Sequence, residues 1–86
     1  MTVSKVRIIG IDVNVDHKTA VYVLEVDGQR IEFLGQIHYD GATVRGVSIP
    51  DEMECILHKV DAKSPVIVRP TFNIIEGLQV RFPIDL

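Results

Sequence analysis

The side chains of this sequence that could carry acid–base or metal chemistry lie in two short stretches. Asp12, Asp16 and His17 precede a long β-rich region, and His38 and Asp40 follow it. Carboxylates and imidazoles can share a metal ion, or act as a general acid and base, once the fold brings them close together. These five residues are therefore a candidate cluster for binding a small ligand or a metal and for acid–base catalysis.

The same residue types are also typical of turns, so their presence alone does not define a site. Asp and Asn side chains hydrogen-bond to the backbone of turns, and water keeps turns polar. The sequence contains no glycine-rich phosphate loop, no Ser/His/Asp motif and no paired metal-binding cysteines. We therefore assign no catalytic residue, no metal and no cofactor from the sequence, and we keep the five residues as a candidate ligand-binding cluster only.

The element that would position these residues is a β-hairpin over residues 19–39. Asp27 and Gly28 separate two β-rich runs, and Asp-Gly is a strong signal for a two-residue type I′ turn. Such a turn places Tyr22 opposite Phe33, and a slip of one residue would move every apolar side chain to the other face. The predicted apolar face consists of Ala20, Tyr22, Leu24, Val26, Ile31, Phe33, Gly35, Ile37 and Tyr39.

A further strand predicted over residues 3–13 completes an antiparallel meander over residues 3–39. In a meander, the end of the first strand, the start of the second and the end of the third lie at the same end of the sheet. The candidate cluster falls at this end. On the opposite face of the hairpin, Val21 and Leu34 are predicted to lie across from each other, which leaves an apolar patch for another segment or a partner to cover.

The second half of the sequence predicts one amphipathic helix over about residues 49–61. Ser48 and Asp51 have the spacing of a capping box, and acidic residues in the first turn suit the helix dipole. Four apolar residues recur at helical spacing and would face the sheet: Met53, Ile56, Leu57 and Val60.

The remaining segments are predicted as strands. Residues 42–47 form a weak strand, residues 66–69 a short one, and residues 72–84 a long strand that bends at Gly77. A short helical turn over residues 71–76 is the alternative for the last segment. The prediction is an α+β fold with a mostly antiparallel sheet and one helix, in the order βββ(β)αββ, and residues 1–86 are taken as one small domain.

The run Ile8-Ile9-Gly10-Ile11-Asp12, followed by a turn and two antiparallel strands, resembles the opening of ribonuclease-H-like and actin-like domains. The resemblance covers about the first 40 residues. It implies that an acidic residue on the first strand, here Asp12, binds a catalytic metal or contacts a nucleotide. Two-metal chemistry needs several converging carboxylates, and residues 66–69 carry none. We therefore do not adopt a nuclease function.

Composition narrows the classes of partner. The 86 residues carry a net charge of −3, which disfavours nucleic acid as a partner, and no apolar run is long enough to span a membrane. The single cysteine, Cys55, excludes an internal disulfide and fits a reducing compartment. The first residues lack the pattern of a signal peptide, so we expect a cytoplasmic protein.

These observations lead to two functional hypotheses. The first, which we favour, is a small cytosolic, non-catalytic interaction or regulatory protein of the adaptor or inhibitor type. It would form a homo-oligomer through a sheet edge or the exposed apolar face, and it could have a further protein partner. The alternative is a small-ligand-binding or metal-binding acid/base enzyme with its site around Asp12, His17, His38 and Asp40.

Overall fold

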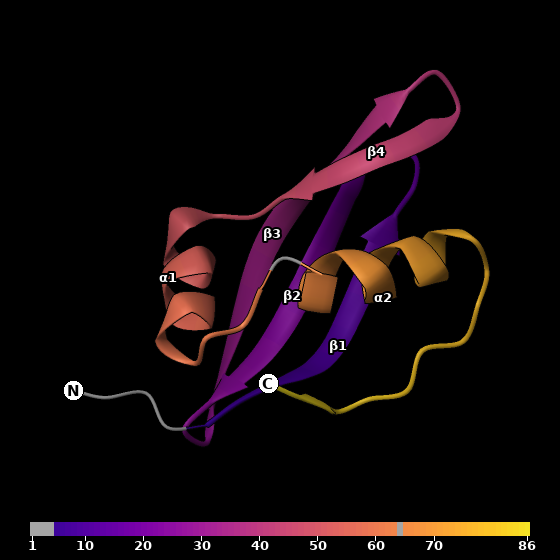
Figure 1. Ribbon diagram of the computed structural model, residues 1–86. Coiled ribbons are helices and arrows are strands. Elements are labelled where there is room, and N and C mark those ends of the chain that lie inside the picture. The colour runs from indigo at the N-terminus through magenta and orange to yellow at the C-terminus, as the bar shows by residue number, and fades with distance from the viewer. Residues whose placement is uncertain (1–4, 64) are drawn as a thin grey trace.

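The computed structural model describes residues 5–63 and 65–86 (Figure 1). Five strands form one sheet in the spatial order β4-β3-β2-β1-β5, and every pairing is antiparallel. The predicted α+β class and the mostly antiparallel sheet are therefore confirmed. The elements are β1 (Val6–Asn14), β2 (Thr19–Val26), β3 (Gln29–Asp40), β4 (Thr43–Ser48), α1 (Asp51–Lys59), α2 (Pro65–Ile75) and β5 (Ile84–Asp85).

The predicted hairpin is confirmed residue by residue. Tyr22 lies opposite Phe33 in the β2–β3 pairing. Asp27 and Gly28 have φ values of 47° and 88°, as a type I′ turn requires at both central positions. The turn also holds the start of the chain, because the Asp27 amide donates to the Lys5 carbonyl and the Lys5 amide donates to Asp27 Oδ1, both at 2.9 Å.

The meander is present, with one irregularity in β1. The first residues of the strand predicted over 3–13 lie outside the described residues, and β1 runs from Val6. A bulge between Ile8 and Gly10 shifts the alternation of β1 by one residue, so that Ile8 lies beside Leu24 and Ile11 beside Tyr22. Two isoleucines at odd spacing therefore share the same face of the sheet. This accounts for the dense apolar run in β1.

The core lies between one face of the sheet and the two helices (Figure 1). The sheet face that packs against the helices is called here the inner face, and the other is called the outer face. The predicted apolar face of the hairpin is the inner face. Fully or almost fully buried side chains come from both layers: Val6, Ile8, Ala20, Tyr22, Leu24, Phe33, Ile37, Met53, Leu57 and Ile67.

Helix α1 lies where the sequence placed it, but it begins differently. It spans Asp51–Lys59 within the predicted 49–61, and its N-cap is Pro50, with no side-chain hydrogen bond to the first turn. The prediction that Ser48 caps this helix is wrong. Ser48 is the last residue of β4, and its hydroxyl hydrogen-bonds instead to Nε2 of His38 on the neighbouring strand.

The C-terminal strands are the main correction to the predicted order. Residues 66–69 are not a strand but belong to helix α2, and the predicted long strand over 72–84 is absent from the structure. Gly77, with φ of 82°, ends the helix. The Gly77 amide donates to the Ile74 carbonyl and the Leu78 amide to the Asn73 carbonyl, which together form a Schellman motif. The alternative of a helical turn over 71–76 was closer to the structure.

Only the last part of the predicted strand pairs with the sheet. In β5, Ile84 lies beside Ile8 and Asp85 beside Arg7, and Arg7 Nε lies 3.0 Å from Asp85 Oδ1. The observed order is thus ββββααβ in place of βββ(β)αββ. No helix in the described part of the chain is long and apolar enough to cross a membrane.

A buried hydrogen bond connects the centre of the sheet to α2. The Tyr22 hydroxyl lies 2.8 Å from Thr71 Oγ1, and Thr71 donates to the Ile67 carbonyl at 2.7 Å, so Tyr22 is the donor in the first bond. Both side chains are fully buried. Gly35 makes room for the ring, because a Cβ at this position would lie 2.8 Å from Tyr22 Cε2 and 3.0 Å from the Ser48 carbonyl oxygen.

We predict that Thr71→Val destabilises the protein more than Tyr22→Phe. The valine leaves the Tyr22 hydroxyl buried without an acceptor, at a cost of about 1–3 kcal/mol, whereas the phenylalanine removes the donor and should cost about 0.5–1.5 kcal/mol. The double variant should be more stable than Thr71→Val alone, because no buried hydroxyl is left unpaired. Urea unfolding of the three variants measures these free energies. Additive effects in the double variant would show that the two hydroxyls are not coupled.

Candidate functional site

The strand register spreads the predicted cluster along the sheet. Asp12 pairs with Val21, which pairs with Leu34, so these three residues form one row across the sheet. Asp40 follows Leu34 by six residues on β3, a rise of about 20 Å. The β3–β4 hairpin therefore extends past the end of β1 and β2 and carries His38 and Asp40 away from Asp12.

Each member of the cluster has its own local surroundings. Asp16 and His17 lie exposed in the turn between β1 and β2, where the His17 amide donates to Asn14 Oδ1 at 3.1 Å. Asp40 Oδ2 lies 3.6 Å from Arg45 Nη1 across the β3–β4 hairpin. The structure thus brings His38 to a serine and Asp40 to an arginine, but it does not bring the five residues together.

The described residues contain no group of three or more His, Cys, Asp or Glu side chains arranged to hold a metal ion. The single cysteine, Cys55, is exposed on α1. A ligand-binding role for individual members of the predicted cluster stays a prediction, because nothing in their geometry points to a shared ligand.

The outer face of the sheet carries an apolar patch that neither helix covers. We call Val21, Val23 and Leu34 the outer patch. Val21 and Leu34 lie directly opposite each other, as the sequence predicted, and Leu34 is 59% exposed. None of the three packs against the core on the inner face.

Charged residues border the outer patch at one end and at its side. At the end near the Asp27-Gly28 turn, Arg7 lies 3.6 Å from Glu25 and Arg30 lies 3.9 Å from Glu32, in partly exposed ion pairs. In the row of Val21 and Leu34, Asp12 lies beside Val21, and its side chain is exposed. The outer face is therefore a small apolar patch with arginine–glutamate ion pairs toward one end and the carboxylate of Asp12 at its side on β1.

Both edges of the sheet carry features that interrupt pairing with another strand. β4 has a bulge opposite the His38/Tyr39 step, and its extra residue, Arg45, is exposed and charged. β1 has its own bulge, and β5 covers Arg7 and Ile8 at its outer edge. Bulges and edge charges are the usual protection against edge-to-edge association.

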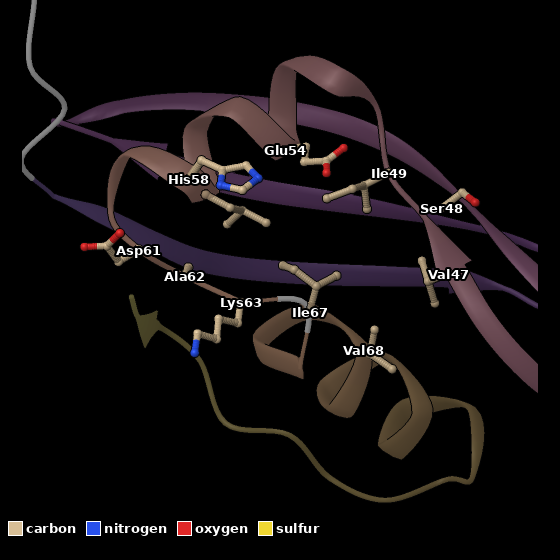
Figure 2. A pocket seen from close by; sticks show the side chains of 11 residues that line it. Val47, Ser48, Ile49, Glu54, His58, Asp61, Ala62, Lys63, Ile67 and Val68 are labelled. Carbon is tan, nitrogen blue, oxygen red and sulfur yellow. The ribbon is translucent and has the colours of Figure 1, made fainter.

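A second surface feature, which the sequence did not predict, is a groove between the two helices. It has a volume of about 680 Å³ and is called here the interhelical groove (Figure 2). The sequence analysis missed it because one of its walls, α2, was predicted as a strand. The groove is lined by Val47, Ser48, Ile49, Glu54, Leu57, His58, Asp61, Ala62, Lys63, Ile67 and Val68.

The helical spacing of residues 65–75 was the signal that could have revealed this wall. Ile67, Thr71 and Ile75 recur every four residues, which places them on one side of a helix. Ile67 and Thr71 are buried, and Ile75 is partly buried against the core.

Burial in the core raises the pKa of the Tyr22 hydroxyl above its ordinary value of 10.0. The side chain therefore stays protonated well into the alkaline range.

Comparison with known proteins assigns no family. A scan against protein-family models finds no match, and a search of curated proteins finds none either. The fold and its surfaces define a two-layer α+β protein with an open sheet face and a groove between two helices.

We predict that alkaline pH destabilises the protein through Tyr22. The unfolded chain releases the tyrosine proton near pH 10.0, whereas the folded chain holds it, so the free energy of unfolding falls as the pH rises above this value. Urea unfolding from about pH 9.5 to 11 should show a steeper loss of stability for the native protein than for Tyr22→Phe. Equal slopes for the two proteins would contradict this prediction.

Proposed function

We propose that the protein is a non-catalytic interaction protein of the adaptor or inhibitor type, which self-associates through the outer patch. The observation that carries the proposal is the pair formed by Val21 and Leu34 on a sheet face that neither helix covers. A second copy presents the same three apolar side chains, so two copies can bury the patch in an isologous contact.

Two features of the sheet favour its face over its edges. The bulge at Arg45 hinders the addition of a strand to β4, and β5 occupies the edge of β1 at Arg7 and Ile8, whereas the outer patch has no comparable obstacle among the described residues. The patch is small, so we expect a weak dimer with a dissociation constant of about 10 µM to 1 mM.

The alternative acid/base or metal-binding function requires Asp12, His17, His38 and Asp40 to converge. The register separates Asp12 from Asp40 by about 20 Å along the strands. No specific observation favours this alternative, and we do not propose it. We propose a cytoplasmic setting, supported by the exposed thiol of Cys55, which a reducing compartment keeps unoxidised. The net charge of −3 supports a protein partner over nucleic acid.

We predict that Leu34→Glu weakens self-association at least about tenfold, because it removes an apolar contact and places like charges near the two-fold axis. Leu78→Glu is the matched control, since Leu78 is 55% exposed but lies outside the sheet. Analytical ultracentrifugation over a concentration series measures both constants. A native protein that stays monomeric near 1 mM, or equal effects of the two variants, would overturn the proposal.

His38→Ala is a second control and should leave association unchanged, since His38 lies beyond the last residue of β3 that pairs with β2.

A further inference from the structure

The interhelical groove has apolar walls on opposite sides. Leu57 on α1 and Ile67 on α2 are 4% and 2% exposed, and they form the deepest part of the lining. Val47 and Ile49, at the end of β4 and just after it, close one end of the groove (Figure 2). A volume of about 680 Å³ lies within the range of small-ligand pockets, about 300–1,000 Å³.

Two polar side chains of the groove, Glu54 and His58, come from α1. Glu54 and His58 are four residues apart and therefore lie on the same side of the helix. Figure 2 shows their side chains next to each other above Ile67. Among the described residues, none forms an ion pair with Glu54.

The charge of the lining favours a cation. Glu54 and Asp61 contribute two carboxylates, and Lys63 contributes the one permanently cationic group. The Lys63 amino group points away from Glu54 and His58 in Figure 2. A positive group placed beside Glu54 would meet an unpaired carboxylate, and the imidazole of His58 in its neutral form offers a hydrogen-bond acceptor. An anionic ligand at the same position would be repelled.

We propose that the interhelical groove binds a small organic amine carried on an apolar body. The ammonium group lies at Glu54 beside His58, and the apolar body lies between Leu57 and Ile67. The volume and the enclosure by two helices and the end of β4 match a compact ligand better than a long peptide. This proposal does not depend on self-association, because the outer patch lies on the other face of the sheet.

Three probes that differ only in the head group test the proposal. They are 4-phenylbutylamine, 4-phenylbutan-1-ol and 4-phenylbutanoate, and the amine is protonated at neutral pH. Titration of ¹⁵N-labelled protein, followed by amide chemical shifts, should give a dissociation constant of about 1 mM for the amine. The shifts should centre on Ile49, Leu57, His58 and Ile67. The alcohol should bind more weakly, and the acid more weakly still.

A matched pair of variants tests the role of the carboxylate. Glu54→Gln removes the charge at the groove, and Glu52→Gln removes an acidic residue from the same helix turn outside the groove lining. Both are exposed and affect the helix dipole alike, so both variants should fold. Glu54→Gln should weaken amine binding about threefold to fivefold and leave alcohol binding unchanged, while Glu52→Gln changes neither.

Each contrary result overturns a stated part of the proposal. Shifts outside the groove would exclude the site, equal binding of the amine and the acid would exclude the preference for a cation, and equal effects of the two glutamine variants would exclude Glu54 as the partner of the ammonium. Leu34→Glu should bind the amine as the native protein does. Loss of amine binding in that variant would show that the groove depends on the dimer.

Discussion

The turn at Asp27 and Gly28 determines which side of the sheet each side chain of β2 and β3 occupies. Both residues have positive φ, and this geometry permits a two-residue loop and one register only. With that register, Tyr22 faces the helices and Leu34 faces away from them. A shift by one residue would expose the apolar side chains of the core and bury the charged side chains of the outer face. The core, the outer patch and the surface on which both helices pack therefore depend on this turn.

The hydrogen bond between Tyr22 and Thr71 links the register of the hairpin to the position of helix α2 in the second layer. Helix α2 includes Pro70, which lacks the amide that would bond to the Val66 carbonyl, so its own backbone provides less support than that of a regular helix. The burial of Ile67 and Thr71 against the sheet compensates for the stability that the missing hydrogen bond would give. The position of α2 in turn fixes one wall of the interhelical groove, and thus the hairpin register indirectly shapes the groove.

The two halves of the chain differ in how far their sequence predicts their structure. The hairpin could be predicted in full because the turn chemistry and the alternation agree. Residues 66–69 are harder to predict, because Val66, Ile67 and Val68 are β-branched and precede Pro70, which locally favours a strand. The helical spacing is visible only over the longer range 65–75, in which Ile67 and Thr71 are buried. The candidate cluster failed to assemble for another non-local reason: β3 spans 12 residues and β2 spans 8, so His38 and Asp40 extend past the meander.

The alternation of β-strand side chains also explains how one small domain can carry two independent surfaces. Val21 and Tyr22 are neighbours on β2, yet one belongs to the outer patch and the other to the core under the groove. A partner on the outer face therefore leaves the groove open, and a ligand in the groove leaves the patch open. If each binds only the folded chain, each stabilises the same fold by mass action. Their coupling would then require a change in the sheet itself, which the close packing of Tyr22 against Gly35 resists.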